Sequence, residues 1–100
     1  MLYDSTKVLI RGMLRDMETI ESIHWEDQVE LGRECLYEMH QMTRPQYKGW
    51  RADAKGHAAG VSEFVRATRA IPFVKSMVSA IRRKDQATAL ISGRAALAEM

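Results

Sequence analysis

The chain has a single cysteine among its 100 residues, Cys35, so it cannot form an internal disulfide. Disulfides are the usual stabiliser of small secreted domains, and their exclusion agrees with a reducing compartment. No apolar run approaches the roughly 20 residues that a membrane-spanning helix needs. The apolar run at residues 8–10 is too short for the core of a signal peptide. We therefore expect a protein of the cytoplasm or of the interior of a virion, with no membrane partner.

The sequence also lacks the residue groups of a catalytic or metal site. The three histidines, His24, His40 and His57, lie in different segments, and none has a neighbour at metal-ligand spacing. The glycines of residues 56–60 lack the preceding strand and the spacing of a phosphate-binding loop. The carboxylates of residues 26–38 lack the differently buried surroundings that make one group an acid and another a base. We expect no cofactor, no metal and no enzymatic activity.

What remains is the composition of an ordinary globular protein, 46% hydrophobic and 28% charged, in a chain of the length of one domain. Seven methionines is a high number for this length. Flexible thioethers fill gaps in a core, and they also suit adaptable contact surfaces. We expect the methionines mainly in the core, together with Cys35, which falls on the apolar side of its predicted helix.

The two halves of the chain have opposite charge. Residues 1–42 contain four basic and nine acidic side chains, a net charge of −5. Residues 43–100 contain eleven basic and four acidic side chains, a net charge of +7. The predicted single helical domain, residues 1–100, therefore has an acidic half (1–42) and a basic half (43–100), and this asymmetry is the main functional signal.

The N-terminal half has the apolar spacing of helices. Apolar residues recur at steps of three and four over residues 9–20, which predicts a helix of about 18 residues with Asp4 or Ser5 as its N-cap. The apolar phase slips over residues 22–25, so we expect a tight turn there and a second helix that ends near residue 42. The alternative is one unbroken helix over residues 5–42, because no proline or glycine forces a stop near the turn.

The C-terminal half predicts three more short helices. One is expected over about residues 58–70, the next starts at Pro72 and ends in a basic cluster, and the last covers about residues 86–99 with Asp85 as its cap. No strand pattern occurs. The predicted fold class is all-α, a small bundle of four or five short helices with an N-terminal antiparallel helical hairpin.

An acidic stripe marks the second predicted helix. Four glutamates follow one another at four-residue spacing, and only Arg33 is near enough to offset their repulsion. We interpret the stripe as one half of a contact with a partner, with a solvated face that keeps the protein soluble as the alternative. The stripe residues are Glu26, Glu30, Glu34 and Glu38.

Two basic groups follow in the second half. The first combines cations at steps of four, three and four with two aromatic residues, which suits phosphate contacts and stacking. A loop interrupted by glycines, with its cations in solvent, would have the same sequence pattern. The second closes a predicted helix, where the helix dipole favours cations. The groups are Arg44, Tyr47, Lys48, Trp50, Arg51 and Lys55, and then Arg82, Arg83 and Lys84.

A helix-turn-helix over residues 61–83 is a further interpretation, with residues 70–72 as the turn and residues 73–84 as the reading helix. The sequence disfavours it. The usual glycine before the turn is missing, and the cations lie at the C-terminal end of the reading helix, away from its base-reading end.

These observations lead to two main functional hypotheses. The first is a non-enzymatic assembly or adaptor protein, a homo-oligomer in which the acidic half of one copy, or of a different protein partner, meets the basic half of the next. The alternative is a nucleic-acid-binding module that uses residues 44–55 and the cluster at residues 82–84. A third hypothesis, an inhibitor that presents the acidic stripe as a nucleic-acid mimic, ranks lower because the mimic would carry its own basic half.

Overall fold

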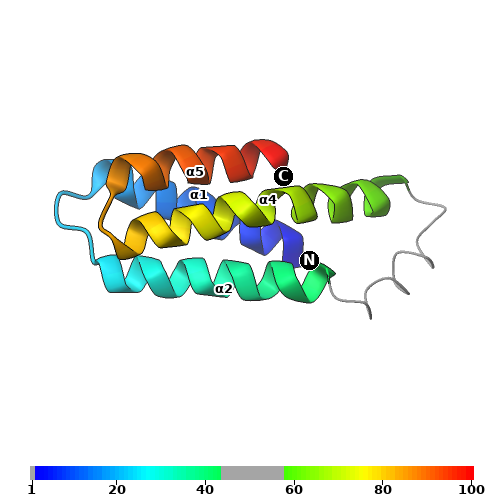
Figure 1. Cartoon of the computed structure of the whole chain (residues 1–100), viewed down its shortest axis with the longest axis horizontal. Helices are drawn as coiled ribbons and strands as arrows, with labels where there is room; N and C mark the ends of the chain where they lie inside the picture. The colour runs from blue at the N-terminus through cyan, green and yellow to red at the C-terminus, as the bar shows by residue number, and fades with distance from the viewer. Residues whose placement is uncertain (1, 44–57) are drawn as a thin grey trace.

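The computed structural model describes residues 2–43 and 58–100, with side chains described for residues 4–43 and 65–100. These residues form four helices and no strand, so the prediction of a small all-α bundle is confirmed for the described part of the chain (Figure 1). The helices are α1 (Leu2–Thr19), α2 (Trp25–Thr43), α4 (Ala58–Arg82) and α5 (Gln86–Glu99).

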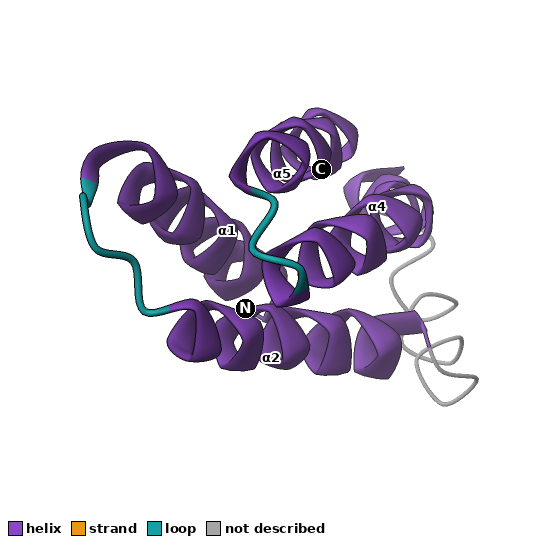
Figure 2. Ribbon diagram, turned by 60° about the vertical axis from the view of Figure 1, so that its left-hand side comes forward, coloured by secondary structure: helices purple, strands orange, loops and turns teal. Residues whose placement is uncertain are grey.

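The four helices surround one common core. Each packs mainly against two others, in the order α1, α2, α4, α5 and back to α1, and Figure 2 shows this arrangement. Each helix therefore keeps one face toward the core and another toward solvent. The solvent-facing sides of α2 and α4 carry the charged groups considered below.

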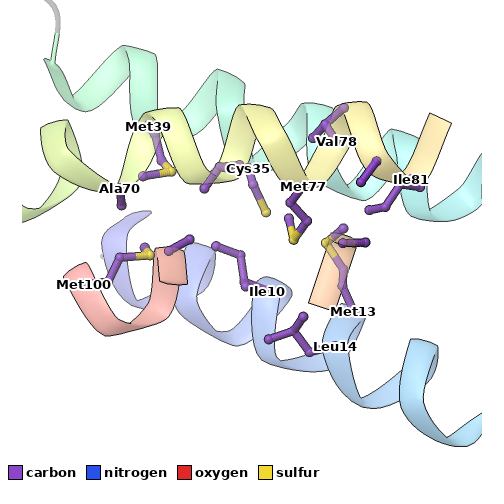
Figure 3. Close-up of a cluster of buried hydrophobic side chains, with 14 of the residues drawn as sticks. Ile10, Met13, Leu14, Cys35, Met39, Ala70, Met77, Val78, Ile81 and Met100 are labelled. Carbon is purple, nitrogen blue, oxygen red and sulfur yellow. The ribbon is translucent and has the colours of Figure 1, made fainter. Parts of the chain in front are cut away.

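Methionine supplies much of the core. Five of the seven methionines are buried, and they come from α1, α2, α4 and the C-terminal residue (Figure 3). Alanines from α4 and α5 fill the spaces between them, which lets the helices approach closely. The prediction that methionine and Cys35 serve the core is confirmed for the described residues. The buried methionines are Met13, Met17, Met39, Met77 and Met100.

The N-terminal segment forms two helices and not one. Five residues, 20–24, separate α1 from α2, so the predicted turn is confirmed and the alternative of one unbroken helix is wrong. Interactions at the end of α1 support the break. The Thr19 hydroxyl donates to the Arg15 carbonyl, and the Gln86 side chain donates to the carbonyl of Met17. The second bond satisfies the Met17 carbonyl, whose helical partner would be the amide of residue 21, beyond the end of α1.

The predicted N-cap of α1 is wrong. The helix begins at Leu2, so Asp4 and Ser5 lie inside it and not before it. Asp4 occupies the first turn, where a negative charge interacts favourably with the positive end of the helix dipole.

The predicted break at Pro72 is also wrong. Residues 58–82 form the single helix α4 with Pro72 inside it, so no turn exists at residues 70–72 and the helix-turn-helix interpretation fails. A proline inside a helix costs one backbone hydrogen bond and about 3 kcal/mol in an isolated helix. Apolar side chains on both sides of Pro72 are fully buried at helical spacing, and their burial favours a continuous helix. They are Ala67, Ala70, Val74, Met77 and Ile81.

Helix α4 ends in a tight hydrogen-bonded turn. The Asp85 amide donates to the Ala80 carbonyl and the Lys84 amide donates to the Ile81 carbonyl, each at 2.9 Å. Lys84 has a φ of 57°, the left-handed conformation that this Schellman turn requires. The Asp85 carboxylate then accepts from the Thr88 amide at 3.1 Å, which confirms Asp85 as the cap of α5. Hydrogen bonding to Thr88, first to its side chain and then to its amide, holds the pKa of the Asp85 carboxyl below its ordinary value.

Candidate functional site

The acidic stripe on α2 is largely a solvent-facing surface. Glu26, Glu30 and Glu34 are exposed, whereas Gly32 and Cys35 on the opposite side of the helix are buried against the core. The helical period explains this division, because residues four apart share a face. Periodicity in the sequence predicted the orientation of these three glutamates correctly.

The fourth glutamate of the stripe lies in a different environment. Glu38 is half-buried, and its carboxylate accepts a hydrogen bond from the Thr6 hydroxyl of α1 at 2.7 Å. Glu38 therefore contributes to the contact between α1 and α2, while the other three glutamates extend into solvent. We use the name acidic face of α2 for Glu26, Asp27, Glu30, Glu34 and Tyr37.

A shallow, open hollow of about 660 Å³ lies within the acidic face of α2. Glu30 forms an ion pair with Arg33 at 3.5 Å, and both side chains are well exposed. Tyr37 is 64% exposed, so its ring is available to a partner. Asp27 and Tyr37 were not predicted from the sequence. Each lies three residues from a glutamate of the stripe, Asp27 from Glu30 and Tyr37 from Glu34, which is the spacing of neighbours on one helix face. The lining residues are Asp27, Glu30, Leu31, Arg33, Glu34 and Tyr37.

The acidic face is not neutralised by the basic half within the described segments. Across residues 4–43 and 65–100, the other ion pairs join Arg83 to Asp85 at 3.8 Å and Arg94 to Glu18. Arg33, the ionic partner of Glu30, belongs to α2 itself. The net negative charge of α2 therefore faces solvent.

The predicted cluster at the end of α4 lies at an exposed turn. Arg82, Arg83 and Lys84 are all exposed. Arg83 donates to the Ser79 hydroxyl at 2.9 Å as well as pairing with Asp85. Lys84 and Glu26 both line a second hollow of about 320 Å³, so the structure brings these two predicted residues to the same end of the bundle.

The other predicted basic group lies outside the described residues. This group comprises all of the selected side chains between residues 44 and 55: Arg44, Tyr47, Lys48, Trp50, Arg51 and Lys55. Their roles therefore stay predictions.

Additional cations occupy the solvent side of α4. Arg66, Arg69 and Lys75 are exposed, and Phe73 is 38% exposed between them. This group was not predicted from the sequence, because the break expected at Pro72 separated Arg66 and Arg69 from the residues that follow. In one continuous helix, Arg69 and Phe73 are four residues apart and therefore neighbours.

The chemical groups that would indicate catalysis are not found in the described part of the molecule. Burial, followed by the nearby charges of Glu38 and Glu34, raises the pKa of the Cys35 thiol to about 12, so this cysteine is not an activated nucleophile. No cluster of His, Cys, Asp or Glu there has the arrangement of a metal site. None of the helices, within the same residues, has the length and apolarity to cross a membrane.

Comparisons with protein families, curated proteins and solved structures find no significant match. Any inference about function therefore comes from the surfaces of this chain alone.

Proposed function

We propose that this protein is a non-enzymatic assembly or adaptor protein that forms electrostatically complementary contacts, with copies of itself as the first partner. The acidic face of α2 would meet a basic surface of the next copy. Contacts between unlike surfaces are head to tail, so they close into a ring or continue as a filament. A reducing compartment, the cytoplasm or a virion interior, agrees with the single free cysteine.

The observation that carries this proposal is the exposure of Glu26, Glu30 and Glu34 without cationic partners from the described C-terminal residues. Like charges on one helix face repel one another, by a few tenths of a kcal/mol for each neighbouring pair. A basic surface on another molecule would remove that repulsion and guide the encounter.

We also propose that α1 and α2 form an antiparallel hairpin that presents the acidic face. The connection of residues 20–24 joins the end of α1 to the start of α2. Thr6, near the start of α1, bonds to Glu38, near the end of α2. The short connection at one end and this hydrogen bond at the other support an antiparallel pair, which would hold α2 with its acidic face away from α1.

Light scattering coupled to size exclusion tests self-assembly. We expect oligomers at micromolar concentration in about 50 mM salt that dissociate in about 500 mM salt, because salt screens charges across an interface. A monomer at both ionic strengths would reject self-assembly and leave only the version with a different protein partner.

Nucleic-acid binding stays the second candidate, and the exposed Arg66, Arg69, Lys75 and Arg82 on α4 favour it. It predicts that the logarithm of the binding constant falls linearly with the logarithm of salt concentration. Fluorescence anisotropy with labelled single- and double-stranded oligonucleotides measures this slope. The absence of binding at low salt would eliminate the candidate.

A further inference from the structure

One edge of α4 combines cations with an aromatic ring. Arg66, Arg69 and Phe73 follow one another at steps of three and four, so they share one side of the helix, and all three are exposed. We call these residues the arginine edge of α4. Among the described residues, neither Arg66 nor Arg69 has an ion-pair partner.

The arginine edge points away from α2 of the same chain. Val78 marks the side of α4 that contacts α2, since it lies against Gly32. At about 100° per residue, Arg69 lies about 180°, Phe73 about 140° and Arg66 about 120° around α4 from Val78. The arginines therefore lie on a different side of α4 from its contact with α2.

The acidic face has the matching orientation on α2. Gly32 marks the side of α2 that contacts α4, and Tyr37 lies about 140° around the helix from it. Glu30 and Glu34 each lie about 160° from Gly32. The two surfaces thus lie on separate helices, and each is turned away from the contact between α2 and α4.

The chemistry of the two surfaces is complementary. Guanidinium groups form paired hydrogen bonds with carboxylates and stack on aromatic rings. Arg66 and Arg69 lie about one helical turn apart, as do Glu30 and Glu34 beside the open hollow. Phe73 would offer an apolar contact to Tyr37 and Leu31, and paired aromatic rings stabilise a contact beyond the area that they bury. Arg83 suits this role less well, because it already bonds to Ser79 and Asp85.

We infer that the arginine edge of α4 is a docking surface for the acidic face of α2 in a second copy of this chain. This inference rests on the proposed function, because it names the surface by which one copy recognises the next. The contact is head to tail: each copy binds one neighbour through its acidic face and the other neighbour through its arginine edge.

Charge reversal tests the pairing. The α4 variant carries Arg66→Glu and Arg69→Glu, and the α2 variant carries Glu30→Lys and Glu34→Lys. A matched control carries Arg11→Glu and Arg15→Glu on α1, which are also exposed and change the net charge from +2 to −2 as the α4 variant does. Circular dichroism first establishes that each variant keeps its helices.

Sedimentation velocity at low salt then measures association. We expect the α4 and α2 variants each to weaken self-association at least about tenfold, which is about 1.4 kcal/mol. An equimolar mixture of the two should assemble again, because the reversed surfaces are complementary. The α1 control should stay within about threefold of wild type, a change of less than about 0.7 kcal/mol.

Three outcomes would overturn the inference: wild-type association by the α4 variant, no assembly in the mixture, or an equal loss in the α1 control. In each case a salt-sensitive wild-type oligomer would leave the proposed function intact and place the contact on another surface. A wild-type protein that stays monomeric at low salt would instead reject self-assembly itself.

Discussion

A methyl group placed on Gly32 of α2 would lie 2.6 Å from Cγ2 of Val78 on α4, closer than real contacts of this kind. Val78 is 4% exposed and branched at Cβ, so its side chain has little room to move aside. Helices α2 and α4 therefore approach this closely only because residue 32 has no side chain. The acidic face of α2 and the arginine edge of α4 both lie on the sides of their helices that point away from this contact.

Replacement of Gly32 by alanine should destabilise the fold by about 1–3 kcal/mol, because overpacking forces the two helices apart. Urea unfolding followed by circular dichroism measures this change. Gly12 on α1 is the matched control, since a methyl group there meets nothing within 4 Å. Gly12→Ala should stabilise by about 0.5–1 kcal/mol through helix propensity. Equal effects of the two substitutions would contradict the close approach.

Replacement of Gln28 by methionine should stabilise the protein by about 1 kcal/mol, since a buried polar atom without a partner carries a desolvation penalty. Gln28 is 6% exposed, and its Oε1 atom has no hydrogen-bond partner among the residues that the structure describes. Thermal unfolding of Gln28→Met and of the half-exposed control Gln41→Met makes the comparison. A lower melting temperature for Gln28→Met than for the control would show that the amide oxygen is satisfied in solution.

Cys35 should resist alkylation in the folded protein. Its pKa of about 12, against 9.0 for an unperturbed thiol, lowers the thiolate fraction near pH 8 by about a thousandfold. Labelling with iodoacetamide in buffer and in urea tests this protection. Rapid labelling of the native protein would contradict it.

The raised pKa of Cys35 also determines how the stability of the fold should depend on pH. Above pH 9 the unfolded chain loses the thiol proton while the folded chain retains it, so stability should fall as pH rises from about 9 toward 12. Urea unfolding of wild type and of Cys35→Ala across this range isolates the thiol contribution. Identical slopes for the two proteins would show that Cys35 does not contribute.

Replacement of Lys84 by glycine should stabilise the protein by about 1 kcal/mol, since a residue with a side chain pays that penalty in the left-handed conformation. The φ of 57° at Lys84 is the only positive value among the described non-glycine residues. Arg83→Gly is the control, because Arg83 precedes the left-handed position and has a negative φ. The melting temperature should rise for Lys84→Gly and not for Arg83→Gly. A rise for Arg83→Gly and not for Lys84→Gly would contradict the assignment of the turn.

Local features of the sequence were predicted well because they depend on neighbours within about four residues. Apolar spacing identified α1, α2 and α5, and Asp85 was recognised as a cap from its position before an apolar helix. The prediction of a break at Pro72 was wrong because the continuity of α4 depends on contacts with residues distant in the sequence. The local cost of Pro72 is outweighed by the burial of Ala70 and Val74, and that burial exists only once α2 and α5 pack against α4.

The sequence by itself determined the helical class, the opposite charges of the two halves and the solvent-facing side of α2, since all three follow from composition and from the helical period. Only the tertiary structure decided that Glu38 meets Thr6, that Gly32 meets Val78, and that Arg69 points away from α2. These relationships depend on how helices distant in the sequence are placed around the shared core. That placement results from close packing of side chains across the whole bundle, which no short stretch of sequence encodes.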